Sequence, residues 1–131
     1  MDNHDYYCDS HYKKILIIDD EPFILDIFSQ FLSDAGYDIQ SASSNDEAIK
    51  YAQQTVFDLI LLDVHMKGIG FSEFIAFLTE TNGKYSTIPI IAVTGMPDAI
   101  LEEDREFLSG VLEKPFTPDA LLSSIRSVID S

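Results

Sequence analysis

The chain has 131 residues, of which 46% are hydrophobic, so it is long enough for one compact domain with a sizeable core and too short for two ordinary ones. Its 23 acidic residues against 8 basic ones give a formal net charge of −15, which disfavours direct binding to nucleic acid or to an anionic membrane. Cys8 is the only cysteine, which excludes an intramolecular disulfide and a multi-cysteine metal site.

Residues 1–12 are polar and show no apolar periodicity, so we expect a flexible N-terminal tail before a domain that spans residues 13–131. The tail lacks the basic start and apolar stretch of a secretion signal, and no apolar run in the chain approaches the length of a membrane span. We therefore expect a soluble, cytoplasmic protein.

Short apolar runs alternate with amphipathic stretches through the rest of the chain. In chain order the predicted elements are a strand at 14–18, a helix at 22–35, a strand at 37–42, a helix at about 45–54, a strand at 57–62, a helix around 71–78, a strand at 88–93, a weaker, acid-rich helix at 99–108, a short strand that begins at 111–112, and a helix after residue 118. Pro22 suits the first turn of the first helix and Gly36 its end, while Ser44 or Asn45 caps the second helix and Thr117 the last.

Five strands that alternate with five helices predict an α/β fold, because each crossover between parallel strands needs a covering helix. The expected architecture is a three-layer (βα)5 sandwich with a parallel sheet of flavodoxin-like order 2-1-3-4-5. That order places the first and third strands side by side.

Polar residues stand at the ends of four predicted strands: Asp19 and Asp20, Asp63, Thr94, and Lys114. Ligands of open parallel sheets bind outside the carboxyl ends of the strands, so these residues are expected to converge on one pocket. Each residue taken singly also suits a helix cap or a turn, and Asp58 is predicted to be a solvated turn residue. The coincidence of four strand ends favours a functional site.

Carboxylates crowded at one edge of a sheet repel each other unless a cation neutralises them. Oxygen ligands without supporting His or Cys select a hard ion, and a site that shares its ion with a phosphate favours Mg²⁺ over Ca²⁺. Asp63 is then a candidate nucleophile toward phosphorus, with Lys114 as the cation and Thr94 as a hydroxyl donor to the phosphoryl oxygens. The predicted product is an aspartyl phosphate on Asp63.

Four motifs, ILIIDDEP, LILLDVHM, IIAVTG and LEKPF, resemble those of the receiver domain of bacterial two-component response regulators over about residues 13–130. The resemblance implies that Asp63 accepts a phosphoryl group from a sensor histidine kinase or a histidine phosphotransfer protein. It implies Mg²⁺ bound through the side chains of Asp20 and Asp63 and the backbone carbonyl of His65, with Asp19 acting through a water of the ion.

The resemblance further implies that Thr94 and Lys114 contact the phosphoryl group, and that the bond between Lys114 and Pro115 is cis, an isomer that is plausible only before proline. Two departures from the family pattern stand out. Lys67 follows Met66 where members usually have proline, and Val111 replaces a Tyr or Phe that in many members swings inward. Valine is stiff at χ1 and cannot make that swing, which puts the usual output switch in question.

The leading functional hypothesis is a phosphorelay response regulator whose phosphorylation switches contacts with a downstream protein target through the face formed by the fourth helix, fifth strand and fifth helix. We expect no direct contact with nucleic acid or membrane, and a monomer or a weak dimer through that same face. The protein would not be an enzyme beyond assisting its own phosphorylation and dephosphorylation. Two roles stay open for His65: it aligns or excludes attacking water, or it takes no part in the chemistry.

The alternative is an interaction module of the same fold that signals without phosphorylation, suggested by Val111 and the altered loop after Asp63. A hydrolase or phosphotransferase acting on small molecules would want a second carboxylate close after the nucleophile, but Val64 and His65 follow Asp63. A flavin site is disfavoured because the first loop is acidic where a phosphate cradle would be needed. The chain ends about where the last helix should, so we expect a stand-alone regulator or an excised receiver.

Overall fold

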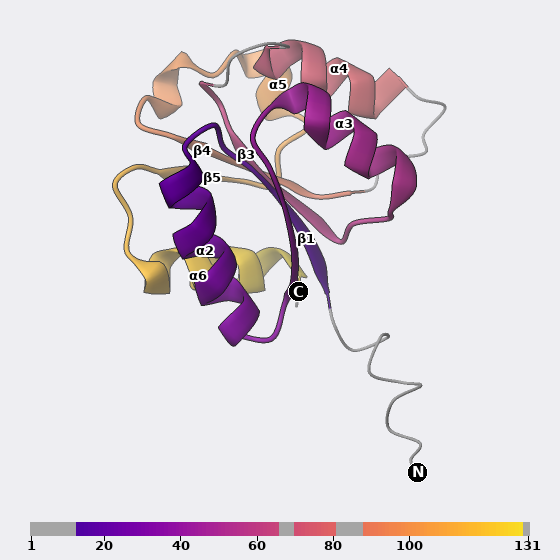
Figure 1. Cartoon of the computed structure of the whole chain (residues 1–131). Helices are drawn as coiled ribbons and strands as arrows, with labels where there is room; N and C mark the ends of the chain where they lie inside the picture. The colour runs from indigo at the N-terminus through magenta and orange to yellow at the C-terminus, as the bar shows by residue number, and fades with distance from the viewer. Residues whose placement is uncertain (1–12, 66–69, 81–87, 130–131) are drawn as a thin grey trace.

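Within the residues that the computed structural model describes, which are 13–65, 70–80 and 88–129, the chain forms a five-stranded parallel sheet of order β2-β1-β3-β4-β5 (Figure 1). The elements in chain order are β1 (Lys14–Ile18), α2 (Pro22–Asp34), β2 (Asp38–Ala42), α3 (Asn45–Gln54), β3 (Leu59–Asp63), α4 (Phe71–Glu80), β4 (Ile90–Thr94), a 3₁₀ turn (Pro97–Ala99), α5 (Glu102–Arg105), β5 (Gly110–Glu113) and α6 (Pro118–Ile129). The predicted α/β fold and strand order are confirmed.

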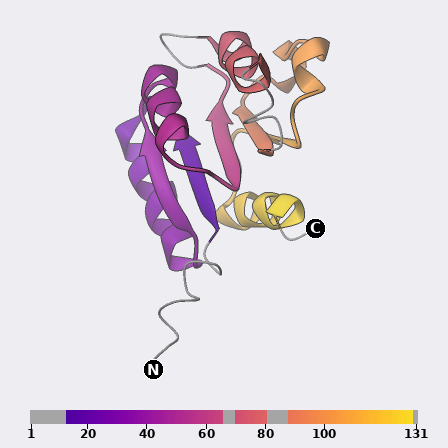
Figure 2. The ribbon, with the colours of Figure 1, turned by 90° about the vertical axis from the view of Figure 1, so that its right-hand side faces the viewer.

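Helices cover both faces of the sheet, with α2 and α6 on one face and α3 and α4 on the other (Figures 1 and 2). Side chains alternate between the two faces along each strand. In β1, Ile15 and Ile17 pack toward α2 and α6, whereas Leu16 and Ile18 pack toward α3 and α4. The central strands β1 and β3 are therefore apolar on both faces, as their continuous apolar sequences predict.

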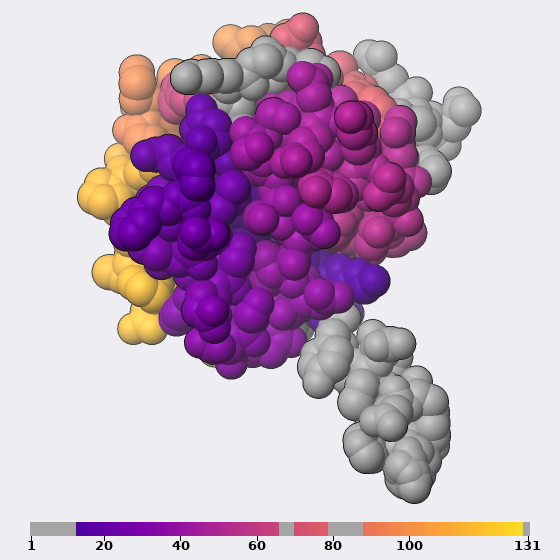
Figure 3. Space-filling view, in the orientation of Figure 1, coloured from indigo at the N-terminus to yellow at the C-terminus, as the bar shows by residue number. Residues whose placement is uncertain are grey.

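The two apolar layers enclose the strands on both sides. Phe74, Ile75 and Leu78 of α4 are buried in one layer, and Leu121 and Ile125 of α6 in the other. In the space-filling view the side chains of α2, in indigo, and of α3, in magenta, form adjoining surfaces on the face that is shown (Figure 3). This packing fixes the strand ends, and hence the loops that follow them.

Local sequence signals explain where several helices begin and end. Gly36 follows the last turn of α2 with φ 102°, a left-handed conformation that glycine adopts at little cost. Ser44 caps α3, since its hydroxyl accepts the backbone N–H of Glu47 at 3.1 Å, and the Glu47 carboxylate accepts the N–H of Ser43 at 2.7 Å. Both caps agree with the sequence-based prediction.

The segment predicted as one helix over residues 99–108 is instead divided. A 3₁₀ turn ends at Ala99, and α5 is a single turn, Glu102–Arg105. Ile100 lies between them with an extended backbone and is only 5% exposed, so anchoring its side chain in the core interrupts the helix. Like charges within Glu102–Glu106 also disfavour a longer helix here.

Two of the sequence-based predictions fall outside the described residues: the flexible tail at 1–12, and the departure from the family pattern at Met66 and Lys67. Among the helices that the structure does describe, none combines the length and the apolar character required to cross a bilayer.

Candidate functional site

Three carboxylates meet at the carboxyl edge of the sheet. Asp19 and Asp20 follow β1, and Asp63 is the last residue of the adjacent strand β3. One oxygen from each of the three lies within 4.8 Å of those of the other two. Asp19 is 4% exposed and Asp63 is 6% exposed, so two of the three carboxylates are largely removed from water. Strand order accounts for this arrangement, because β1 and β3 are neighbours in the sheet.

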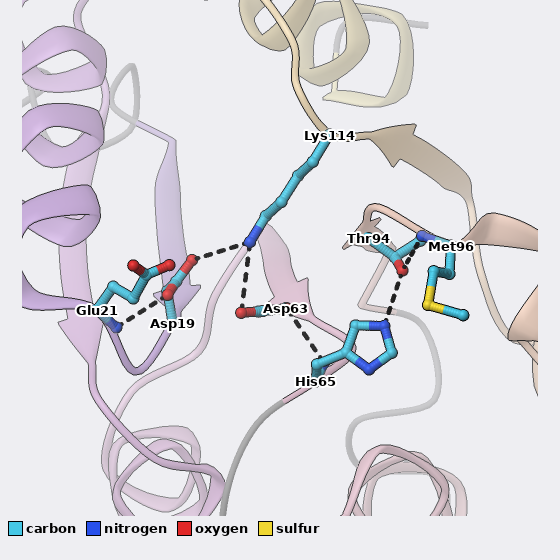
Figure 4. A network of polar contacts seen from close by, with 7 residues as sticks. All are labelled: Asp19, Glu21, Asp63, His65, Thr94, Met96 and Lys114. Atoms are coloured by element: carbon cyan, nitrogen blue, oxygen red, sulfur yellow. Dashed lines mark hydrogen bonds and ion pairs between the residues drawn. The ribbon is translucent and has the colours of Figure 1, made fainter.

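Lys114 extends across this edge from the end of β5 and points between two of the carboxylates (Figure 4). Its Nζ lies 3.5 Å from Oδ2 of Asp63 and 3.8 Å from Oδ2 of Asp19. The lysine side chain is 31% exposed, so it remains accessible from solvent. The peptide bond from Lys114 to Pro115 is cis, in agreement with the family resemblance.

The backbone after each strand holds the carboxylates in place. The N–H of Glu21 donates to Oδ1 of Asp19 at 3.0 Å, and the N–H of His65 donates to Oδ1 of Asp63 at 3.1 Å. These bonds leave Oδ2 of both carboxylates facing Lys114. The Oδ2 atoms are therefore the ones nearest to a positive charge.

Burial raises the pKa of the Asp19 carboxyl above its ordinary value, and the nearby charge of Asp63 raises it further. The backbone N–H of Glu21 and the charge of Lys114 oppose this shift without cancelling it. Asp19 is thus an acid whose ionised form lacks sufficient compensation from the protein itself. An added cation beside it would supply that compensation.

The donor set fits a small divalent cation. Carboxylate oxygens are hard ligands, and oxygens on opposite sides of Mg²⁺ lie about 4.2 Å apart. The spacing within 4.8 Å is therefore close to a coordination sphere. With all three carboxylates ionised and Lys114 charged, the group is left with two uncompensated negative charges, which matches a divalent ion.

Thr94, the last residue of β4, is fully buried and adjoins Asp63 through the pairing of β3 with β4. Its hydroxyl oxygen accepts the N–H of Met96 at 2.9 Å and lies 3.2 Å from Nε2 of His65. The imidazole of His65 points toward Thr94, whereas its backbone N–H contacts Asp63 (Figure 4). This side-chain contact is absent from the sequence-based predictions, which considered only a role of the ring toward water.

A groove of about 520 Å³ adjoins the acidic site on the side of α2. It is lined by Glu21, Ile24, Phe28, Lys114, Pro115 and Phe116. The rings of Phe28 in α2 and of Phe116 pack with centroids 5.2 Å apart. The exposed side chains of Phe23 and Ile27 also lie on α2. The surface beside the site is thus largely apolar.

The fold and the site define a class of protein with an acidic pocket at the carboxyl edge of a doubly wound parallel sheet. The chain matches the family model described as the response regulator receiver domain over residues 15–126. It belongs to that family.

Known relatives agree with this assignment. The chain is 36% identical over 122 residues to the transcriptional regulatory protein YvrH of Bacillus subtilis, an alignment that covers 87% of this chain and 48% of the relative. The chemotaxis response regulator CheY4 of Vibrio cholerae is similar in structure, with a TM-score of 0.80 and 30% identity over 89% of this chain and 98% of that one. The chain spans about half the length of most of the curated relatives that it matches.

A further similar structure is the response regulator TrrA from Thermotoga maritima, solved in complex with Mg²⁺ and BeF. It has a TM-score of 0.77 and 27% identity, with 88% of this chain and 98% of that chain covered.

Of the residues predicted for the site, Asp19, Asp20, Asp63 and Lys114 come together at one edge, and Thr94 lies beside them on the next strand. Their roles in phosphoryl transfer remain predictions, as does the backbone carbonyl of His65 as a metal ligand. Val111 is half-buried in β5, where it pairs with Ala92 of β4.

Proposed function

We propose that this receiver domain accepts a phosphoryl group on Asp63 in a Mg²⁺-dependent reaction, from a sensor histidine kinase or a histidine phosphotransfer protein. The observation that carries the proposal is the position of Lys114, whose ammonium group lies 3.5 Å from Oδ2 of Asp63 inside a cluster of three carboxylates. A carboxylate so placed can attack phosphorus, because the cation offsets repulsion between two anions.

In the proposed reaction a carboxylate oxygen of Asp63 forms a bond to phosphorus as the bond from phosphorus to the donor's imidazole nitrogen breaks. The leaving nitrogen keeps the electron pair of that bond. Lys114 would pair with one phosphoryl oxygen, and the hydroxyl of Thr94 would donate to another. Thr94 ends β4, which pairs with β3, and Lys114 follows β5 with its Nζ already 3.5 Å from Asp63, so neither would need a large backbone movement.

Asp20 and Asp63 are proposed to hold Mg²⁺ directly, with the carbonyl of His65 as a further ligand and Asp19 acting through a bound water. The ion would neutralise charge on the carboxylates and on the phosphoryl oxygens. The spacing of the acidic cluster supports this proposal, and so does the similarity to TrrA, whose structure contains Mg²⁺ and BeF.

The apolar groove along α2 is proposed to help the phosphodonor protein dock beside Asp63. Its lining includes Lys114, which reaches into the acidic site, so a partner seated there would lie close to the phosphoacceptor. Exposed Phe23 and Ile27 extend the apolar surface of the helix. Such a surface rimmed by polar residues is typical of a protein interaction site.

The output is proposed to be a change in contacts with a downstream protein, through the face of α5, β5 and α6, which is also the proposed surface of a weak dimer. The strong acidic balance argues against direct contact with nucleic acid or membrane. On this proposal the protein is a cytoplasmic phosphoacceptor that assists its own phosphorylation and dephosphorylation, rather than an enzyme for small molecules.

A second candidate function is a receiver-like interaction module that signals without phosphorylation. Val111 is the observation that favours it, because a half-buried β-branched side chain in β5 cannot make a large rotamer change. The intact set of carboxylates and lysine favours the phosphoacceptor.

Intact mass after incubation with Mg²⁺ and acetyl phosphate separates the two functions. The wild type should gain one phosphoryl group, and Asp63→Asn and a sample without metal should gain none. Asp26→Asn, which neutralises an exposed carboxylate of α2, is the matched control and should behave as the wild type. A folded, Mg²⁺-binding wild type that gains no mass would favour the phosphorylation-independent module.

A further inference from the structure

His65 contacts both the proposed phosphoacceptor and Thr94, the first through its backbone and the second through its side chain. Its backbone N–H donates to Oδ1 of Asp63 at 3.1 Å, and its Nε2 lies 3.2 Å from the hydroxyl oxygen of Thr94. Figure 4 shows the ring turned toward Thr94 and away from the Asp63 carboxylate. His65 therefore contacts both Asp63, which would carry the phosphoryl group, and Thr94, whose hydroxyl would hydrogen-bond to it.

A threonine hydroxyl has one proton to donate and two lone pairs that accept. In this structure the N–H of Met96 occupies one lone pair of Thr94 at 2.9 Å. Nε2 of His65 carries a proton both in the Nε2–H tautomer and in the imidazolium form, so in both it donates to the second lone pair. With both lone pairs engaged, the hydroxyl can act toward a third group only as a donor.

We propose that His65 is a positioning residue whose Nε2–H, together with the N–H of Met96, fixes the Thr94 hydroxyl as a hydrogen-bond donor to a phosphoryl oxygen on Asp63. The inference rests on the proposed phosphorylation of Asp63. A phosphoryl oxygen only accepts hydrogen bonds, so a hydroxyl already fixed as a donor needs no reorganisation when the phosphoryl group arrives. His65 thereby acts through Thr94 and needs no contact with the phosphoryl group.

The opposite tautomer makes an opposite prediction. If Nε2 lacked a proton, it would accept the hydroxyl proton of Thr94 and compete with the phosphoryl oxygen for it. Removal of the ring would then speed phosphorylation instead of slowing it. The sign of the effect therefore identifies which partner donates.

Two substitutions of His65 by amide side chains separate the loss of the hydrogen bond to Thr94 from the loss of side-chain volume. In His65→Gln the side-chain amide nitrogen occupies nearly the place of Nε2 and can still donate to Thr94. In His65→Asn the amide is one carbon shorter and falls short of the hydroxyl. Because His65 is exposed, neither substitution removes a side chain from the core.

The test measures the rate at which acetyl phosphate with Mg²⁺ phosphorylates each variant, and the affinity of each for beryllofluoride with Mg²⁺. Loss of one hydrogen bond is expected to lower both in His65→Asn by about two- to tenfold. His65→Gln should retain values near those of the wild type. In a Thr94→Val background, which lacks the hydroxyl, the Gln and Asn variants should no longer differ.

An independent measurement determines the protonation of the His65 ring directly. The ¹⁵N shifts of the His65 imidazole in the wild type report which nitrogen carries the proton, and a protonated Nε2 is expected. A bare Nε2 in the wild type would overturn the inference, and so would a His65→Asn variant that is phosphorylated as fast as the wild type or faster. A wild type that takes no phosphoryl group would instead reject the proposed function, and the inference with it.

Discussion

The ammonium nitrogen of Lys114 lies 3.5 Å from Oδ2 of Asp63, although β4 separates β5 from β3 in the sheet. The long lysine side chain crosses above the end of β4 to reach the carboxylate, and it also comes within 3.8 Å of Asp19. The Lys114 ammonium group therefore lies close to two buried carboxylates at the edge of the sheet. The remaining negative charge makes the site receptive to a divalent ion.

Replacing Lys114 by methionine should slow phosphorylation of Asp63 by about a hundredfold or more, the effect typical of removing a group that stabilises developing charge. Methionine keeps much of the length of the side chain and removes its positive charge. The measurement is the rate of mass gain with acetyl phosphate and Mg²⁺. Lys50→Met, at an exposed position of α3, should leave that rate unchanged. An unimpaired Lys114→Met variant would show that the lysine has no part in the transfer.

Parallel-sheet geometry made much of the site predictable. Asp63 and Thr94 are the last residues of β3 and β4, and Lys114 directly follows β5. The carboxyl ends of parallel strands lie at the same edge of the sheet. The periodicity of apolar residues likewise predicted α2 and α6 as amphipathic helices, and both pack on the sheet. These features follow from local patterns and from a small number of allowed topologies.

Contacts between loops do not follow from apolar periodicity or from the order of the strands. The contact of the His65 ring with Thr94 depends on the path of the backbone after β3, which no periodicity specifies. Asp58, predicted to be a solvated turn residue, is half-buried and accepts the N–H of Lys14 at 2.8 Å, so it joins β1 to the start of β3. The break in the helix at Ile100 arises because burial of one side chain outweighs local helix propensity.

Asp19→Asn should stabilise the metal-free protein at neutral pH. Burial raises the pKa of Asp19, so the folded state favours the protonated carboxyl. The protonated carboxyl contributes fully to stability below the ordinary pKa of 3.8, and this contribution is lost as the pH rises through the raised pKa. Asparagine keeps the oxygen that accepts the N–H of Glu21 and carries no charge. Thermal unfolding in EDTA should show a higher Tm for Asp19→Asn at pH 7, and a gain that shrinks as the pH falls through the raised pKa of Asp19 toward 3.8.

Asp58→Asn provides the comparison for that experiment, because the Asp58 carboxylate bonds to a backbone N–H away from the acidic cluster. We expect it to give no gain at neutral pH. Equal stabilisation by both substitutions would indicate a general relief of negative charge rather than a cost specific to the acidic cluster.

Ser72→Ala should destabilise the fold by about 1–3 kcal/mol, because it removes the hydrogen-bond donor to a buried carboxylate. Ser72 of α4 donates its hydroxyl to Oδ2 of Asp104 in α5 at 2.5 Å, and Asp104 is only 7% exposed. Urea unfolding at pH 7 gives the free energy of unfolding for the variant. Ser123→Ala, at an exposed position of α6, should change it little. A neutral Ser72→Ala would mean that water replaces the hydroxyl at no cost.

Mg²⁺ should raise the Tm of the wild type, and the ion should bind less tightly as the pH falls. An ion that binds only the folded protein stabilises it by about 2.7 kcal/mol at a concentration one hundred times the Kd. Protons compete with the ion for the carboxylates, and Asp19, whose pKa is raised by burial, becomes protonated at a higher pH than an ordinary aspartate. Affinity should therefore begin to fall above the usual range for Asp titration.

The measurement is calorimetric titration with Mg²⁺ from pH 7.5 down to pH 4.5, on the wild type and on Asp20→Asn and Asp63→Asn, each of which removes one carboxylate from the cluster. Both variants should bind Mg²⁺ at least tenfold more weakly than the wild type, since a loss of about 1.4 kcal/mol suffices for that factor. Asp26→Asn, which changes an exposed carboxylate of α2, should retain wild-type affinity. Affinity that is independent of pH over this range, or equal in all four proteins, would place the bound ion away from the three strand-end carboxylates.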